Sequence, residues 1–275
     1  DNRVFGNIFH SSAEMFYRDK IGLGRSIHES DLNEYIKHPE LLLPIIDKAF
    51  EQDLFNPKGK SNYRPEYNGL QLLNREVILQ YLIQLLKIDS RLTPFVIRGL
   101  ETDVETNMKV TTSEGERTIR IGGKIDRIDE VSNDNAHRLR VIDYKTSSGE
   151  VKKLKSIEDV FNPAKVRGSH SDYYLQAMLY SDIVSKKGDY YAERLPVSPA
   201  LLFIQHAGSD DYDPTLWFDK EKITDIAAYS EQFTESLQEI LNEIFEPTIP
   251  FEPTEEKGFC SYCPYAKLCG KVTES

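Results

Sequence analysis

The sequence has few cysteines, no long apolar segment and no excess of positive charge, and each of these absences excludes a class of protein. Its 275 residues include three cysteines, all between residues 260 and 269. Secreted disulfide scaffolds instead carry an even number, spread along the chain. There is no run of 18 or more apolar residues that would indicate a membrane span, and no signal peptide is recognisable. We therefore expect a cytoplasmic protein with no membrane partner.

The charge balance argues against a protein that nucleic acid holds by bulk attraction. There are 34 Lys and Arg residues against 45 Asp and Glu residues, which gives a net charge of −11. Contact with DNA would then depend on a local basic strip, a helix end or a bound metal ion. The first residue is Asp rather than Met, so we expect the chain to be an excised or processed fragment.

The predicted elements change in type near Pro94. Residues 29–100 have helical spacing of apolar side chains, as do the first segment (FGNIFHSSAEMFYRDKIG), residues 171–187 and residues 222–246. Residues 96–147 are rich in β-branched side chains and predict a three-stranded antiparallel meander. PALLFIQHA is almost wholly apolar and suits a strand in the sheet interior. The whole predicts a mixed α/β fold.

Two acids and a lysine occupy adjacent predicted strands in GGKIDRIDEVSNDNAHRLRVIDYKTS. Asp143 and Lys145 are two residues apart, so their side chains leave the same face of a strand. Asp126 can reach that face from the preceding strand. Converging carboxylates repel each other unless a cation lies between them, and oxygen ligands suit Mg²⁺ or Mn²⁺. Because a lysine beside the metal can orient or deprotonate a water, this set predicts phosphodiester hydrolysis.

A salt bridge on an exposed sheet face is the alternative interpretation of Asp143 and Lys145, and such pairs are common. The apolar residues of VIDYK argue against it. They predict a central strand, in which an acid and a lysine are unusual.

The sequence resembles the RecB-like branch of the PD-(D/E)XK nuclease superfamily, and the resemblance extends in order along nearly the whole chain. GNIFH is similar to the branch's G-x-x-x-H helix motif, and GGKIDRID to the strand with the metal-binding aspartate. VIDYKTS is similar to the acid-x-lysine signature, and YYLQAMLY to the Q-x-x-x-Y helix. The resemblance implies a restriction-endonuclease-like core, a central mixed sheet flanked by helices. It also implies one nuclease domain over residues 1–275, the C-terminal part of a larger protein. This domain has a helical insertion at 29–100 and a linker and Cys-rich tail at 246–275.

The resemblance also implies roles for individual residues. The implied metal ligands are His10, Asp126, Asp143 and the backbone carbonyl of Tyr144. The implied catalytic residues, besides the two aspartates, are Lys145, Gln176 and Tyr180, with Gln176 orienting the lysine or a DNA phosphate. Many members have a further acid where this chain has Glu101. We do not assign Glu101 a catalytic role, because a structural acid at the start of a strand fits that position at least as well.

Cys260, Cys263 and Cys269 have the spacing C-x2-C-x5-C, whereas a closed zinc site or a four-iron cluster usually has four ligands. Iron–sulfur members of the branch complete a similar set with a cysteine upstream of the G-x-x-x-H motif. The resemblance therefore implies a 4Fe-4S cluster in a full-length protein, with its fourth ligand before Asp1, and no intact cluster in this chain. A zinc site completed by a histidine, or three thiols that bind nothing, are the alternatives.

A basic segment follows the strand that carries the lysine. It supplies candidate DNA contacts at Lys152, Lys153, Lys155, Lys165 and Arg167, although a solvated charged loop explains it equally well. Tyr173 and Tyr174 could stack on bases, but we expect core packing for at least one of them.

Taken together, these features predict a metal-dependent deoxyribonuclease. The branch implies an AddB-like exonuclease domain for recombination or repair, with DNA, single-stranded or unwound, delivered by a helicase domain or subunit. One alternative is a catalytically lapsed, cluster-stabilised DNA-binding or scaffolding module of a helicase–nuclease complex, and another is a nuclease of CRISPR adaptation. The presence of His10, Asp126, Asp143 and Lys145 favours activity.

Overall fold

The structure is a computed structural model that describes residues 2–55, 66–133, 136–147, 153–187, 194–205, 212–252, 254, 257–261 and 263–270. The chain divides into two compact units. The first contains Asp1–Asn107 and Arg120–Leu237, and the second contains Met108–Ile119 and Gln238–Ser275. None of the described helices combines the length and the apolar character that a membrane crossing needs.

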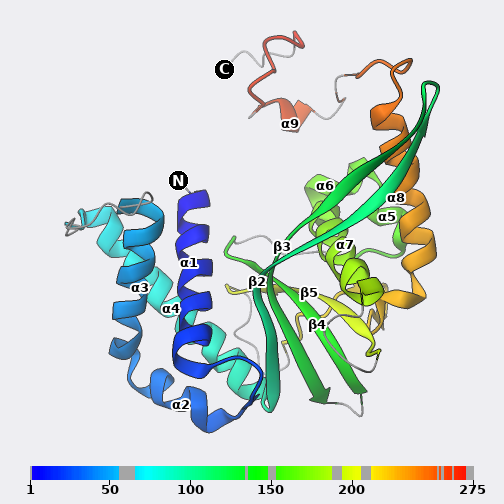
Figure 1. The fold of residues 1–275 in the computed structure, drawn as a ribbon. Coiled ribbons are helices and arrows are strands. Elements are labelled where there is room, and N and C mark those ends of the chain that lie inside the picture. The colour runs from blue at the N-terminus through cyan, green and yellow to red at the C-terminus, as the bar shows by residue number, and fades with distance from the viewer. Residues whose placement is uncertain are drawn as a thin grey trace. The chain divides into compact units, whose positions relative to one another are not determined.

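The first unit begins with helices that gather on one side of a sheet (Figure 1). They are α1 (Asn2–Phe16), η1 (Tyr17–Ile21), α2 (Glu29–Lys37), η2 (Pro39–Leu42), α3 (Leu43–Phe50), η3 (Glu51–Phe55) and α4 (Gly69–Leu92). Asn68 starts α4 with a capping box, in which its side chain accepts from the Gln71 N–H and Gln71 bonds back. α4 ends at Leu92, because Pro94 cannot donate a helical hydrogen bond and disfavours a helical backbone at Thr93. The helical stretch predicted up to residue 100 therefore ends earlier, and a strand starts at Phe95.

The five-stranded sheet has the order β1-β2-β3-β4-β5. Its strands are β1 (Ser26–Ile27), β2 (Phe95–Thr112), β3 (Gly115–Asn133), β4 (Ala136–Lys145) and β5 (Val197–Phe203). The meander predicted over β2, β3 and β4 is confirmed, with β3 and β4 antiparallel, and β4 is an interior strand rather than an exposed edge, as expected. β5 is parallel to β4 and buried throughout. It is nonetheless the last strand of the order rather than an interior strand, and residues 214–216 cover its free edge by exchanging backbone hydrogen bonds with Pro199 and Leu201.

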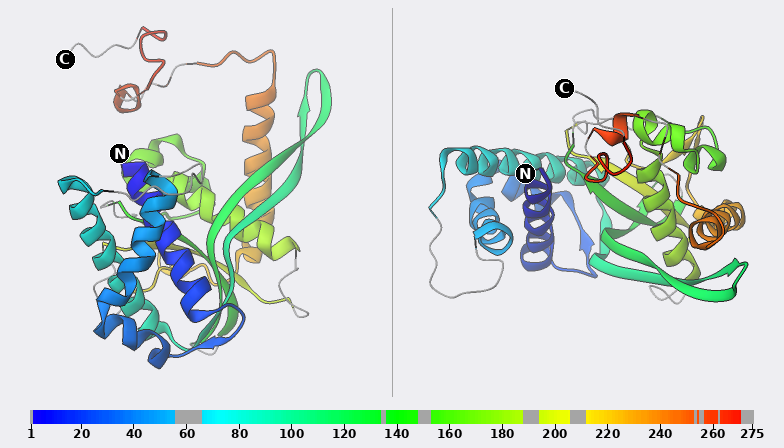
Figure 2. Two further views of the ribbon diagram at one scale, coloured as in Figure 1. Left: turned by 60° about the vertical axis from the view of Figure 1, so that its left-hand side comes forward. Right: turned by 90° about the horizontal axis from the view of Figure 1, so that it is seen from above.

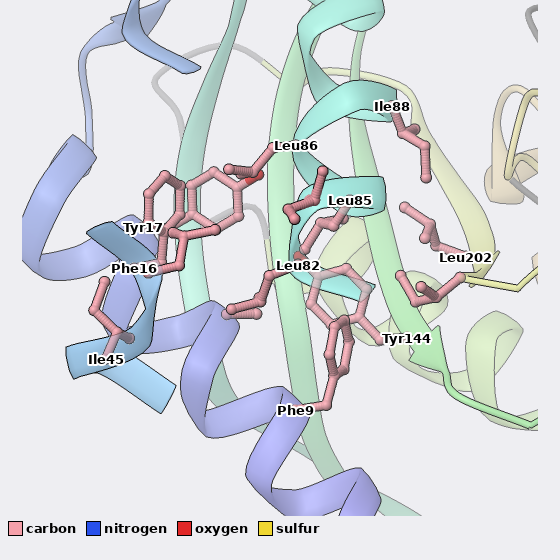
Figure 3. Close-up of a cluster of buried hydrophobic side chains, with 14 of the residues drawn as sticks. Phe9, Phe16, Tyr17, Ile45, Leu82, Leu85, Leu86, Ile88, Tyr144 and Leu202 are labelled. Carbon is pink, nitrogen blue, oxygen red and sulfur yellow. The ribbon is translucent and has the colours of Figure 1, made fainter. Parts of the chain in front are cut away.

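A hydrophobic core joins the N-terminal helices to one face of the sheet (Figure 3). Phe9 from α1 meets the Tyr144 ring of β4 edge-on at 5.8 Å, and Leu202 of β5 lies in the same cluster. Leu82, Leu85, Leu86 and Ile88 of α4 are all buried there, at helical spacing. This packing matters for function because it fixes α1 and β4 relative to each other.

α7 (Ser171–Lys187) covers the other face of the sheet, as Figures 1 and 2 show. It confirms the helix predicted over residues 171–187. The preceding basic segment, for which a solvated charged loop was one interpretation, forms α5 (Ile157–Val160) and α6 (Pro163–Ser169), the latter capped by the Asn162 side chain. Two-residue strands β6 (Trp217–Phe218) and β7 (Glu221–Lys222) and the single turn η4 (Ile226–Ala228) complete this part.

The second unit contains the tip of the β2–β3 hairpin and the C-terminal half of α8 (Ser230–Phe245). The Asn242 side chain accepts from the Thr111 N–H at 2.9 Å, and the Glu246 carboxylate accepts from the Ser113 N–H at 2.7 Å. The helix predicted over residues 222–246 is shorter than expected, because α8 starts only at Ser230. The last described helix is the single turn α9 (Lys257–Cys260).

Candidate active site

The end of the β3–β4 ladder brings two aspartates together. The antiparallel pairing runs from Asn133↔Ala136 to Arg127↔Ile142, and Asp126 and Asp143 are the next residue on each strand. Both side chains are buried, at 8% and 7% exposure. Asp126 Oδ2 accepts the backbone N–H of Tyr144 at 2.6 Å, which holds this carboxylate against the end of β4. The predicted meeting of the two acids follows from this register.

His10 reaches the aspartates from α1. Its Nδ1 lies 3.1 Å from Asp126 Oδ1. The imidazole packs edge-on against the Tyr144 ring, with 5.8 Å between ring centroids, so the aromatic core beneath α1 also orients the histidine. The fold thus brings His10 to the carboxylate of Asp126, which is 116 positions away in the chain.

Glu101 joins this group, which the sequence interpretation did not anticipate. His10, Glu101 and Asp126 each offer a ligand atom within 4.8 Å of the others, and they are the one group of three or more such residues in the described part of the chain. Glu101 sits within β2 at φ +47, where the alternation of buried side chains is interrupted at Gly99 and Leu100. Irregularities of this kind re-aim a side chain. Sequence alternation alone does not reveal such an irregularity, and the loose family match was the one available signal.

We call His10, Glu101, Asp126 and Asp143 the carboxylate–histidine cluster, and its electrostatics indicate uncompensated negative charge. Burial and the nearby charge of Asp126 raise the pKa of Asp143 to about 6, against the opposing effect of Lys145. Burial and Asp126 likewise raise the pKa of Glu101 to about 7. Burial lowers the pKa of His10, but the hydrogen bond to Asp126 and the surrounding acids outweigh it and raise the value.

These residues fit a divalent cation. Three carboxylates converge in a partly dry site, where burial first and their mutual repulsion second raise the pKa values of Glu101 and Asp143. Carboxylate and carbonyl oxygens are the donors that Mg²⁺ and Mn²⁺ prefer. The Tyr144 carbonyl is the further donor that the family resemblance implies, and the β3–β4 pairing ends before Tyr144.

Lys145 lies beside the cluster and is held by α7. Its Nζ is 2.7 Å from Asp143 Oδ2 and donates to Gln176 Oε1 at 3.3 Å. Gln176 in turn donates to the Tyr180 hydroxyl at 3.4 Å, so the predicted helix pair forms a short relay to the lysine. Tyr180 fits because residue 123 is glycine. A Cβ at Gly123 would lie 2.1 Å from the Tyr180 hydroxyl oxygen.

A family model for the PD-(D/E)XK nuclease superfamily matches residues 1–270. The chain belongs to the PD-(D/E)XK nuclease superfamily. In this nuclease the acid-x-lysine signature is Asp143-Tyr144-Lys145 at the end of β4, and the observed mixed sheet flanked by helices is the restriction-endonuclease-like fold that the sequence predicted. No curated protein matches the chain.

The predicted DNA-contacting cations of the nuclease lie on and before α5 and α6. Lys153 is exposed, with its Nζ 4.1 Å above the Trp217 ring, and Lys165 lies 3.9 Å from Asp159. Lys155 and Arg167 are exposed. Within the described residues, none of these four forms an ion pair with the carboxylate–histidine cluster. Lys152 lies outside the described residues.

The three cysteines of the nuclease all lie in the second unit. Cys260 is buried at the end of α9, whereas Cys263 and Cys269 are exposed, and all three are free thiols. Backbone hydrogen bonds from Cys263 to Cys260 and from Cys269 to Tyr265 wind this tail into turns. Over the described part of the chain the three thiols do not form a metal-ligand group.

Proposed function

We propose that this chain is a divalent-metal-dependent deoxyribonuclease that hydrolyses DNA phosphodiester bonds at the carboxylate–histidine cluster. The observation that carries the proposal is the position of the Lys145 ammonium, 2.7 Å from Asp143, at the edge of three converging carboxylates. A purely structural lysine would neutralise one acid. Here two ammonium groups, Lys145 beside Asp143 and Lys124 at 3.9 Å from Glu101, face three carboxylates, which leaves room for a further cation.

In the proposed site, His10, Asp126, Asp143 and the Tyr144 carbonyl hold Mg²⁺ or Mn²⁺, and we add Glu101 to these ligands on the geometry above. When bound, the ion would polarise a phosphoryl oxygen and acidify a water. The protein's own part is positioning. The Tyr144 N–H fixes the Asp126 carboxylate, and the aromatic packing of His10 fixes its ring.

Lys145 has the second proposed role. Gln176 accepts one of its N–H bonds and Asp143 attracts it, which leaves an ammonium proton to orient the attacking water or to offset charge on the phosphate. Tyr180 contributes indirectly, because its hydroxyl accepts from Gln176 and thereby orients the Gln176 carbonyl oxygen toward the lysine. Gln176 and Tyr180 are therefore proposed as positioning residues.

The finer assignment follows the motifs. We propose a RecB-like, AddB-like exonuclease of recombination or repair in the cytoplasm, supplied with DNA by a helicase domain or subunit. We also propose that Cys260, Cys263 and Cys269 supply three ligands to a 4Fe-4S cluster, with a fourth from elsewhere. Iron and sulfide analysis of the full-length protein after anaerobic reconstitution tests the cluster, and equal iron in that protein and in its Cys263→Ser variant would contradict it.

The catalytic proposal is tested with end-labelled linear and covalently closed circular DNA, single- and double-stranded, in Mg²⁺ or Mn²⁺. We expect digestion of the linear DNA, and a loss of at least about 100-fold in Asp126→Ala and Lys145→Ala. Matched controls are Asp103→Ala on β2 and Lys87→Ala on α4, both exposed positions, which should cleave normally. If the unmodified chain cuts nothing, or the active-site variants cut as well as the controls, the lapsed-module alternative replaces this proposal.

A further inference from the structure

Two rings lie stacked beside the candidate catalytic lysine. The imidazole of His170 and the phenol of Tyr173 are nearly parallel, with 4.7 Å between centroids and 9° between planes. The Lys145 Nζ lies 4.1 Å from the centroid of the Tyr173 ring, and the same ammonium is 2.7 Å from Asp143. The stack therefore borders the reaction site directly.

Tyr173 and its neighbour Tyr174 divide between two environments. Tyr174 is 1% exposed, and its hydroxyl donates to the Trp217 carbonyl at 2.9 Å, so it is the core residue that we expected of the pair. Tyr173 is only half-buried, and on α7 it precedes Gln176 by three residues. Residues at that spacing share a helix face, so Tyr173 lies on the face that holds Lys145.

His170 has a left-handed backbone conformation that is uncommon for a histidine, and its side chain stacks on Tyr173. His170 has φ +53, ends α6 by donating its N–H to the Val166 carbonyl, and accepts the Tyr173 N–H at the start of α7. Glycine or asparagine would suit this left-handed position best. The imidazole instead remains half-buried and stacked on Tyr173, which neither backbone bond requires.

The Tyr173 ring is itself covered, because the His170 imidazole and the Lys145 ammonium both lie against it. We propose that the outer face of the His170 imidazole, held in place by Tyr173, is a stacking platform for an unpaired nucleobase beside the reaction site. The inference rests on the proposed nuclease function and names its substrate as single-stranded DNA or a frayed end. Aromatic side chains bind bases of any sequence because every base presents a π-face. A base inside a duplex has both faces covered by its neighbours, so a closed duplex cannot use this platform. Arg167, exposed three residues before His170 and without an ion pair among the described residues, is placed for a flanking phosphate.

The test measures binding without cleavage, with Ca²⁺ in place of Mg²⁺. A labelled short oligothymidine is compared with a strand of the same length and backbone that lacks bases. We expect the unmodified chain to bind the thymidine strand about 5- to 150-fold more tightly. Tyr173→Ala and His170→Asn, which keeps a residue that tolerates the left-handed backbone, should lose most of this difference and retain their affinity for the abasic strand. Tyr173→Phe, which keeps the ring, should preserve the difference.

Equal binding of the two strands by the unmodified chain would overturn the platform, as would variants that weaken both strands alike or bind neither. The cleavage assay separates this failure from failure of the proposed function. Digestion of DNA by a chain that binds both strands equally refutes the platform alone, whereas absence of both binding and digestion refutes the two proposals together.

Discussion

A buried ionic network behind the candidate site gives the sharpest prediction about stability. Arg127 follows Asp126 on β3, and its guanidinium points to the helical side of the sheet, where it is fully buried. It donates to both carboxylate oxygens of Asp89 on α4, at 2.6 and 2.8 Å, and to Asp129 at 2.9 Å. Arg140 of β4 shares the Asp129 carboxylate, also at 2.9 Å. Two arginines and two aspartates thus balance in a dry environment.

The perturbation is Asp89→Asn. A carboxylate accepts from both guanidinium nitrogens, but an asparagine has one acceptor oxygen and an amide that can only donate. The oxygen can keep the bonds from Tyr17 and one Arg127 nitrogen, while the amide faces the other N–H group. The variant therefore loses a hydrogen bond and leaves a net positive charge buried. Removing one partner of a buried ion pair costs about 3–5 kcal/mol in free energy of unfolding.

Urea titration and thermal denaturation measure the loss. For a chain of this length, about 3–5 kcal/mol corresponds to a fall in Tm of roughly 5–10 °C. The matched control is Glu14→Gln, the same chemical change in an exposed i,i+4 pair with Arg18 at 2.7 Å. It should cost less than about 1 kcal/mol. If Asp89→Asn destabilises the protein no more than Glu14→Gln does, the network does not carry the stability argued for it.

Two further predictions concern the site itself. Gly123→Ala places a methyl group 2.1 Å from the Tyr180 hydroxyl oxygen. We expect the free energy of unfolding to fall by about 1–3 kcal/mol, and kcat to fall with little change in KM because Gln176 loses its orientation. A Gly123→Ala variant with normal kcat would contradict the positioning of Gln176 through Tyr180. Metal binding should weaken as the pH falls, because protons on Glu101, with a pKa of about 7, and Asp143, with a pKa of about 6, compete with the ion. Calorimetric titration should give a Kd for Mn²⁺ roughly tenfold higher at pH 6 than at pH 7, and a pH-independent Kd would exclude these acids as ligands.

Much of the fold followed from local patterns. The β-branched residues and turns of residues 96–145 predicted the meander, and the apolar VIDYK predicted a central strand. Both depend on side chains within one hairpin, where period-two alternation is a direct consequence of backbone geometry. The helix that contains Gln176 and Tyr180 was predictable for the same reason, because side chains recur on one helix face about every 3.6 residues. The short helices α5 and α6 were not predicted in the basic segment. The sequence signals for a helix there were one capping residue and one proline, whereas the many charged residues of the segment favoured a loop.

The sequence by itself indicated the superfamily and the residues of the candidate site. It showed an acid and a lysine two residues apart, a second acid one strand earlier, and helix motifs in the order of a nuclease superfamily. Tertiary structure alone decided which side chains meet. Glu101 enters the cluster through a left-handed residue within β2, and Asp89 joins Arg127 from a helix 38 residues away in the chain. Tyr173 reaches the lysine while Tyr174 enters the core. Periodicity reports which way a side chain points from its own element, but these contacts depend on how separate elements pack, and no local pattern encodes that.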